Sequence, residues 1–331
     1  MLHVSADDVE KSFRAWQGVA TLSLETLVAH WFITGANGNL GKQLISYILE
    51  RSSNDQIVAV VRRANARDSI EQLPLSDAAR GRLRIEVADY EDVAGMAQIA
   101  EGCDRAVHLV GILKATKWAS YESAHEHSCE ALVAALKEVG VAHVTYMSIV
   151  GSSIDAANAC LRSKGLAEKI LIDSDVATCV LRVPMVLGVG DYASFALKKR
   201  ASSRISFGFR QASLEQPIYA GDVVETIVLA GEQQSEGIFN LAGPECLSRR
   251  ELTQRAAAIL GSSTTSISLP ISLGLVMAGI MEAALANPPV TRAMLDVLDH
   301  DDQVDATQAL AALNIPELTK LDTMLTKVLR N

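Results

Sequence analysis

Three glycines at a spacing of three residues, Gly35, Gly38 and Gly41, are the residues with the clearest chemical meaning in the chain. They follow an apolar run at 31–34 and precede an amphipathic stretch at 42–51. Glycine permits positive φ and close backbone approach to a ligand, and the first N–H groups of a helix bind phosphate. Between a strand and a helix, the spacing predicts a pyrophosphate site rather than an ordinary glycine-rich turn. The residues predicted to form it are Gly35, Asn37, Gly38, Asn39, Leu40 and Gly41.

Arg62 and Arg63 follow the second expected strand, at 57–61, where dinucleotide sites choose between two cofactors. A carboxylate at this point binds the ribose 2′-hydroxyl of NAD, whereas an arginine accommodates the 2′-phosphate of NADP. A guanidinium can bind a phosphate through two hydrogen bonds, and a carboxylate would repel it. The pair therefore predicts NADP(H), with two solvated surface arginines as the alternative.

Asp89 follows the third expected strand, at 83–87. In a dinucleotide site its carboxylate would accept a hydrogen bond from the adenine amino group. The alternative is a capping role for a helix expected over 91–100.

The elements that must position these residues alternate between strand and helix. Further apolar runs predict strands at 106–110, 144–147 and 177–183, with helices at about 120–139 and 163–173 between them. Such alternation indicates βαβ units. We therefore expect an α/β fold with a doubly wound, Rossmann-type parallel sheet and helices on both faces.

The regularity weakens after Pro184, and the rest is expected to form a smaller, helix-rich substrate region. A late strand at 237–241 would return to the sheet, and Ser248 with Glu251 has the spacing of a capping box for a helix over 247–260. Residues 291–329 are expected to be mostly helical. The predicted division is an N-terminal helical extension (1–30), a cofactor-binding domain (31–190) and the smaller region (191–331).

Composition excludes several classes of protein. The 331 residues are 49% hydrophobic and 21% charged, as in globular proteins that fold without disulfides or metals. A net charge of −9 argues against a nucleic-acid partner. The five cysteines are scattered without a CxxC, which predicts no metal site and a reducing, cytoplasmic location.

The pattern resembles the short-chain dehydrogenase/reductase superfamily, and more narrowly its atypical, epimerase-like branch. That branch contains the nucleotide-binding accessory subunit of mitochondrial complex I and its bacterial relatives. The resemblance runs from Trp31 to the C-terminus. It rests on Thr34 to Gly41, His108 to Gly111, Tyr121 to His125, Met147-Ser148, Leu161 to Lys164, Gln216 to Tyr219, Gly221 to Val223 and Pro288 to Arg292.

The resemblance implies roles for individual positions. Lys164 would hold the nicotinamide ribose hydroxyls, and Ser148 would occupy the catalytic serine position. His125, also histidine in the complex I relatives, is a candidate acid because imidazole titrates near neutrality; a surface histidine is the alternative. The remaining cofactor contacts that the resemblance implies are Val110, Gly111 and Pro184.

Cys160 departs from the superfamily pattern, which places a proton-donating tyrosine four residues before the lysine. A thiol is a weak hydrogen-bond donor, with an ordinary pKa of about 8.5. A nearby lysine could instead lower that pKa and make Cys160 a nucleophile. A small apolar filler is the favoured interpretation.

Two functions follow from this pattern. The first is an NADP(H)-dependent oxidoreductase that reduces or isomerises a carbonyl or alcohol of a small, largely apolar substrate, because the apolar stretch at 271–281 could roof the site. The second is a non-catalytic NADP(H)-binding structural or sensor subunit, which the loss of the tyrosine favours.

Residues 191–215 reverse the charge of the otherwise acidic chain. They include five basic residues and two acidic ones. This excursion could bind an acidic protein partner or a membrane surface, with a peripheral location as the consequence; a solvated loop is the alternative. The residues concerned are Lys198, Lys199, Arg200, Arg204 and Arg210, against Asp191 and Glu215.

Overall fold

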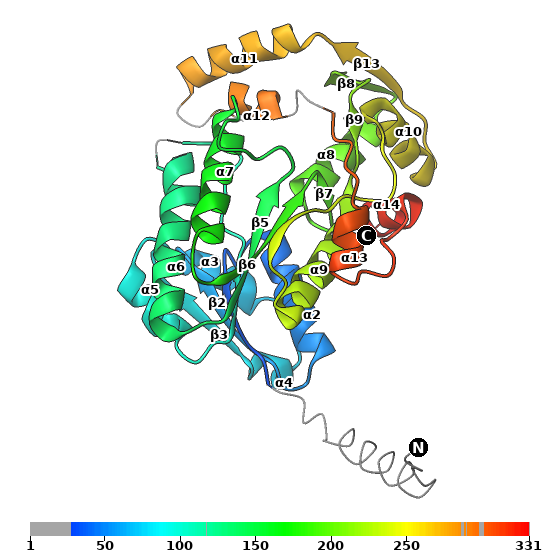
Figure 1. Cartoon of the computed structure of the whole chain (residues 1–331). Helices are drawn as coiled ribbons and strands as arrows, with labels where there is room; N and C mark the ends of the chain where they lie inside the picture. The colour runs from blue at the N-terminus through cyan, green and yellow to red at the C-terminus, as the bar shows by residue number, and fades with distance from the viewer. Residues whose placement is uncertain (1–27, 117, 286–287, 289, 298–300, 331) are drawn as a thin grey trace, which may run out of the picture.

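A seven-stranded parallel sheet in the order β11-β6-β5-β4-β1-β2-β3 organises the chain (Figure 1). The computed structural model describes residues 28–116, 118–285, 288, 290–297 and 301–330. The expected N-terminal extension, 1–30, thus lies outside the described residues except for its last three. The first strand, β1, lies in the middle of the sheet; β2 and β3 extend it on one side, and β4, β5, β6 and β11 extend it on the other. The expected doubly wound, Rossmann-type sheet is confirmed.

The strands are short and mostly apolar because helices cover both faces of the sheet. In the first strand, Trp31 and Ile33 pack on one face and Phe32 on the other, and all three are fully buried. The strands are β1 (His30–Thr34), β2 (Gln56–Val61), β3 (Leu83–Val87), β4 (Arg105–His108), β5 (His143–Ile149), β6 (Ala177–Val183) and β11 (Gly237–Asn240).

Two sets of helices form the outer layers (Figure 1). The first set packs on the face that holds Trp31 and consists of α2 (Asn39–Arg51), α3 (Ala64–Glu71), α4 (Asp77–Arg80) and α9 (Ala220–Gln233). The second packs on the face that holds Phe32 and consists of α5 (Val93–Ala100), α6 (Ser128–Val139) and α7 (Ala159–Ile172).

The helix expected at 120–139 is not uniform. It begins with a π-helical turn, η1 (Glu122–His127), and continues as α6. The wider turn directs both His125 and Ser128 inward, and each is at most 1% exposed. A π-helical turn inside a helix often occurs at functional sites.

A smaller core lies beside the carboxyl edge of the sheet. It is formed by α8 (Tyr192–Ala201), α10 (Arg249–Ile259) and α14 (Leu321–Leu329). The capping box at the start of α10 is present, because Ser248 Oγ accepts from the Glu251 N–H at 3.2 Å and Glu251 accepts from the Ser248 N–H. Residues 191–215, which break the regular pattern of the sequence, contain α8 and two short strands.

Three two-stranded sheets complete this region: β7 (Val186–Leu187) with β10 (Ile218–Tyr219), β9 (Leu214–Glu215) with β12 (Leu247–Ser248), and β8 (Ile205–Phe209) with β13 (Thr265–Leu269). The helix α11 (Ile271–Ala284) follows β13 directly. None of the helices in the described ranges is both long and apolar enough to cross a membrane.

The expectation that 291–329 is mostly helical is confirmed for its described part, although the helices are three separate short ones. The described part contains α12 (Arg292–Val297), α13 (Thr307–Ala312) and α14. Between the first two, Asp302 N–H donates to Leu214 O at 3.0 Å, and Asp301 Oδ1 accepts from Leu214 N–H at 3.0 Å. The backbone there satisfies its hydrogen bonds beside β9 rather than within a helix.

Candidate functional site

The glycine turn connects β1 to α2 in the geometry expected for a phosphate site. Gly35 has φ +71°, and a Cβ at this position would lie 2.9 Å from Leu109 C, so a side chain would clash with the end of β4. A Cβ on Gly41 would lie 2.6 Å from Ala36 O, so α2 packs tightly against the turn. The Lys42 N–H makes an i→i−4 bond to Gly38 O at 3.0 Å, which leaves the N–H groups of 39–41 in the orphan first turn of α2.

A cavity of about 590 Å³ opens over this turn at the carboxyl ends of β1, β2 and β4. It brings together seven of the residues predicted for cofactor binding: Gly35, Asn37, Gly38, Arg62, Arg63, Val110 and Gly111. The residues lining it that sequence reasoning missed are Asn65, Ala66, Ser69, Tyr90, Leu109, Ile112 and Ala124. The cavity is open at one side and large enough for part of a dinucleotide.

Tyr90 ties the glycine turn to the second strand. Its hydroxyl accepts from the Gly35 N–H at 3.1 Å and donates to Val60 O at 3.1 Å. Burial raises the pKa of Tyr90, so the hydroxyl stays protonated and keeps both bonds. The residue follows β3 in the chain, and only the pairing of β3 with β2 brings it to the turn.

Arg62 and Arg63 stand at the rim of the cavity, directly after β2. Both are exposed, and Arg63 occupies the N-cap position of α3, whose first turn contributes Asn65 to the lining. Two guanidinium groups beside a helix N-terminus make this end of the cavity suited to an anion.

Several predicted residues lie outside the lining of the cavity. Asn39 donates through Nδ2 to Val189 O at 3.1 Å, and Leu40 packs against the core on the α2 side of the sheet. Asp89 Oδ1 accepts from the Glu91 N–H at 3.2 Å. It is Asp92, not Asp89, that caps α5, so the capping interpretation of Asp89 is wrong. Pro184 is half-buried at the carboxyl end of β6.

Lys164, on α7, lies behind Gly111 and is not itself among the residues that line the cavity. Its Nζ donates to Met147 O at 2.8 Å and lies 4.4 Å from the ring centroid of Tyr146. A Cβ on Gly111 would lie 3.0 Å from this Nζ. Burial lowers the pKa of Lys164 to about 8. The ammonium therefore adjoins the backbone at 111, where the resemblance places the cofactor.

His125 projects from η1 to the same point. Its Nε2 accepts from the Ile112 N–H at 3.1 Å, and the side chain is fully buried. Burial and the Lys164 charge lower the pKa of His125 to about 3. The imidazole is therefore neutral near pH 7, and it holds the backbone at 111–112 in place.

Ser148 is directed toward a buried ion pair. Its hydroxyl donates to Glu168, and its Oγ lies 3.3 Å from Ser152 Oγ. Glu168 in turn accepts from Arg182 Nε at 3.0 Å. Only 3% of the Glu168 side chain is exposed, so its charge depends on Arg182 and Ser148 for compensation.

Cys160 lies one helical turn before Lys164 on α7. Its Sγ donates to Ile112 O at 3.5 Å, and burial raises the pKa of the thiol. The protonated, buried thiol fits a small space-filling residue and not an activated nucleophile.

A segment formed by α11 and α12, here called the strap, is attached to the loop after β4 and to the start of α7. Lys114 Nζ donates to Pro288 O at 2.9 Å, and Asn158 Nδ2 donates to Ala293 O at 3.0 Å. Asn158 also caps α7 by accepting from the N–H groups of Cys160 and Leu161. Both bonds to the strap are made by residues that follow the apolar stretch at 271–281, so a roof over the site formed by that stretch stays a prediction.

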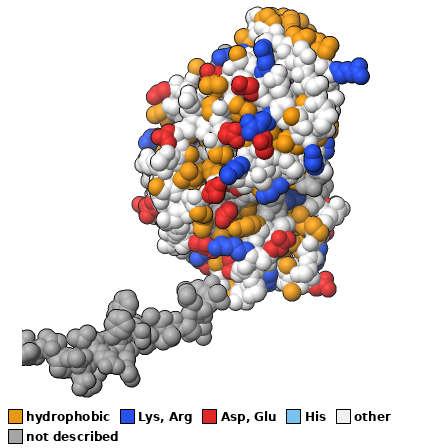
Figure 2. Space-filling view, turned by 90° about the vertical axis from the view of Figure 1, so that its right-hand side faces the viewer, with side chains coloured by type: hydrophobic (Ala, Val, Ile, Leu, Met, Phe, Trp, Pro, Cys, Tyr) orange, Lys and Arg blue, Asp and Glu red, His pale blue; other side chains and the backbone are white. Residues whose placement is uncertain are grey.

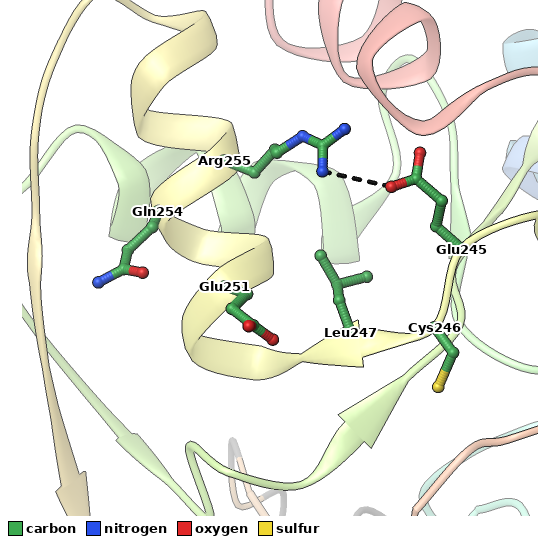
Figure 3. A pocket seen from close by; sticks show the side chains of 6 residues that line it. All are labelled: Glu245, Cys246, Leu247, Glu251, Gln254 and Arg255. Carbon is green, nitrogen blue, oxygen red and sulfur yellow. Dashed lines mark hydrogen bonds and ion pairs between the residues drawn. The ribbon is translucent and has the colours of Figure 1, made fainter.

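A second cavity, of about 460 Å³, lies between α10 and β12 (Figure 3). Its charged groups are already paired: Arg255 with Glu245 at 3.2 Å and with Asp322 at 2.6 Å, and Glu251 with Ser248 at 2.7 Å. It lacks the strand ends and glycines of the first cavity. In the part of the chain that is described, no cluster of three or more histidine, cysteine or acidic residues could hold a metal ion.

Comparison with known proteins identifies an NAD(P)H-binding domain that includes all the residues lining the first cavity. Residues 35–196 match the NAD(P)H-binding family model. Over 91% of its length the chain is 24% identical to NADH dehydrogenase [ubiquinone] 1 alpha subcomplex subunit 9, mitochondrial, of Arabidopsis thaliana, and covers 75% of that protein. It is 22% identical to ceramide reductase of Caulobacter vibrioides, over 78% of this chain and 79% of that protein.

A likeness in fold extends to solved structures. The enzyme WbmH of Bordetella bronchiseptica, in complex with NAD+, superimposes with a TM-score of 0.68 at 17% identity, covering 92% of this chain and 97% of that chain. The resemblance to the short-chain dehydrogenase/reductase superfamily and its epimerase-like branch is confirmed.

Proposed function

The chain contains an NAD(P)H-binding domain of the short-chain dehydrogenase/epimerase type, and on this premise we propose that it is an NADP(H)-dependent oxidoreductase acting on a carbonyl or alcohol of a largely apolar substrate. The observation that supports it most is the position of Lys164, whose ammonium adjoins Gly111 in the lining of the first cavity.

The preference for NADP(H) rests on the rim of the cavity. Arg62 and Arg63 lie at the end of β2 with no carboxylate beside them in the sequence. They would hold the 2′-phosphate, and Asn65 and Ser69 would add polar contacts from α3. The pyrophosphate would lie on the first turn of α2.

The proton that accompanies hydride transfer needs a donor other than tyrosine. Two of the three candidates are occupied by other contacts. The Ser148 hydroxyl donates a hydrogen bond to Glu168, and the neutral His125 accepts one at Nε2 from the Ile112 N–H. Lys164 has a lowered pKa and three N–H donors, and among the described residues its Nζ donates to Met147 O alone. We therefore assign two roles to Lys164: it binds the ribose hydroxyls and it donates the proton.

The reaction balances with these groups. When bound, the nicotinamide cofactor would supply the hydride that the carbonyl carbon takes up. Lys164 Nζ gives a proton to the carbonyl oxygen as the negative charge develops there, so the product is an alcohol and a neutral amine. Solvent then reprotonates the amine. A pKa near the working pH suits such a general acid.

An apolar substrate fits the strap. The loop after β4 exposes Leu113 (55%) near the attachment of Lys114 to Pro288, and α11 is almost wholly apolar. The similarity to ceramide reductase agrees with a lipid-like ketone or alcohol.

A second candidate is a non-catalytic NADP(H)-binding subunit. The observation that favours it is Cys160, whose buried thiol bonded to Ile112 O occupies the position of the usual acid. The similarity to a complex I subunit is consistent with this candidate.

Turnover separates the two. NADPH oxidation is measured with a panel of long-chain ketones, enones and quinones. The matched control for Lys164→Met is Lys169→Met, because Lys169 lies on the same helix but is exposed and pairs with Asp173. The enzyme proposal expects turnover that Lys164→Met abolishes and Lys169→Met preserves. Tight NADPH binding without turnover on any member of the panel favours the subunit.

A further inference from the structure

The outward face of α11 is apolar throughout. Val276 and Ile280 are 61% and 63% exposed, and Leu273 and Met277 are 46% exposed each. The spacing 273, 276, 277, 280 places all four on one stripe of the helix. The opposite stripe, with Gly274 and Ala278, is buried against the protein. Large apolar side chains gathered on one exposed stripe indicate a contact surface.

This stripe continues onto the small sheet of β8 and β13. A Cβ on Gly274 would lie 2.8 Å from the ring of Phe209, so the start of α11 covers the end of β8. Residues of one parity share a face of a strand. Ile205 and Phe207 therefore extend the face that Phe209 begins, and they are 55% and 60% exposed. Ile267 of β13, paired with Phe207, is 40% exposed.

A basic residue borders this face. Arg204 directly precedes Ile205 at the start of β8 and is exposed. It belongs to the basic segment 191–215 of a chain whose net charge is −9. Figure 2 shows hydrophobic side chains gathered at the end of the molecule where α11 lies, with Lys and Arg side chains close by.

We propose that the face formed by Leu273, Val276, Met277 and Ile280 of α11 and by Ile205 and Phe207 of β8 docks on the surface of an anionic lipid bilayer. An apolar stripe inserts into the boundary between headgroups and acyl chains, and basic residues at its rim bind anionic headgroups. Charge complementarity favours this occupant, because the exposed Arg204 borders the face and neither 204–210 nor 265–281 contains a carboxylate. The proposal does not depend on whether the chain is an enzyme.

The test is sedimentation of the full chain with vesicles of phosphatidylcholine mixed with phosphatidylglycerol, and with vesicles of phosphatidylcholine alone. The native chain is expected to sediment with the anionic vesicles, and less at high salt. The double variant Val276→Asp with Ile280→Asp should lose binding by about tenfold or more. Arg204→Ser should weaken it by about fivefold, on anionic vesicles only.

The matched control is Ile172→Asp with Ile238→Asp. This variant replaces two exposed apolar residues at the other end of the sheet with aspartates. It should sediment with the vesicles as the native chain does. NADPH binding and circular dichroism check the folding of every variant, and Val276→Ser with Ile280→Ser replaces the first variant if that one unfolds.

Failure of the native chain to sediment with anionic vesicles would overturn the proposal. So would equal loss in the control variant. Concentration-dependent dimers that only the α11 variants abolish, without vesicle binding, would assign the face to a second copy of the chain instead.

Discussion

Lys164 lies directly against Gly111: a side chain at 111 would place its Cβ 3.0 Å from Nζ and 3.5 Å from Nε2 of His125. Because residue 111 is glycine, one ligand can contact both the Lys164 ammonium and the backbone that follows β4. Under the proposed function, that ligand is the nicotinamide ribose.

Gly111→Val tests this relationship. The branched side chain would displace Lys164 Nζ and fill the inner end of the cavity, so NADPH affinity should fall by about tenfold or more. The control is Gly81→Ala, because a Cβ at Gly81 meets neighbours only at 3.5 Å and beyond. Calorimetric titration of both variants with NADPH provides the comparison. Unchanged affinity in Gly111→Val would remove this contact from the site.

The lowered pKa of Lys164 gives NADPH affinity a pH dependence. Burial lowers it to about 8, so the ammonium is present below that pH and lost above it. The anionic cofactor favours the ammonium, so affinity should decline as pH rises from 7 to 9.5, by at most about tenfold per pH unit for one linked proton. Lys164→Met should weaken binding by about 5- to 150-fold at pH 7 and flatten the profile. A native profile that is already flat would contradict the assignment.

Cys160→Ala should preserve cofactor binding and any turnover. The change removes the bond from Sγ to Ile112 O and leaves a small void, which costs about 1 kcal/mol of unfolding free energy. Thermal melting, NADPH titration and rate measurement on the same preparation distinguish the effects. Loss of turnover at unchanged affinity would make the thiol a catalytic group.

Arg182→Met should destabilise the fold and leave the affinity for the cofactor unchanged. It would leave the Glu168 carboxylate, 3% exposed, without its guanidinium, at a cost of about 3–5 kcal/mol. Adding Glu168→Gln removes the uncompensated charge and should recover much of that loss. Urea unfolding of the two single variants and the double variant measures the coupling. Strict additivity would show that the pair does not act as a unit.

The sequence predicted the sheet and the cofactor end of the site because their signals are local. Apolar runs that alternate with helical periods define the βαβ order, and the glycines at 35, 38 and 41 define the turn. The capping box at Ser248 and Glu251 is equally local and is confirmed.

The sequence did not predict the features that depend on contacts between segments far apart in the chain. Tyr90 reaches Gly35 only because β3 pairs with β2, and Ser148 turns to Glu168 only because α7 crosses β5 and β6. His125 is neutral because it is buried, and it is buried because it lies in a π-helical turn. No residue pattern in the sequence predicted that turn. The stretch at 301–304 bonds to β9, and helical propensity alone could not predict that.

The most direct test of the account is a parallel titration of the native chain and Arg62→Asp with NADPH and with NADH. The native chain should bind NADPH more tightly, because Arg62 and Arg63 would hold the 2′-phosphate. Arg62→Asp should lose NADPH affinity by about 1–3 kcal/mol and affect NADH far less. Arg67→Asp is the control, since Arg67 lies on α3, pairs with Glu71 and stands outside the cavity lining. Equal or tighter binding of NADH by the native chain would contradict the account.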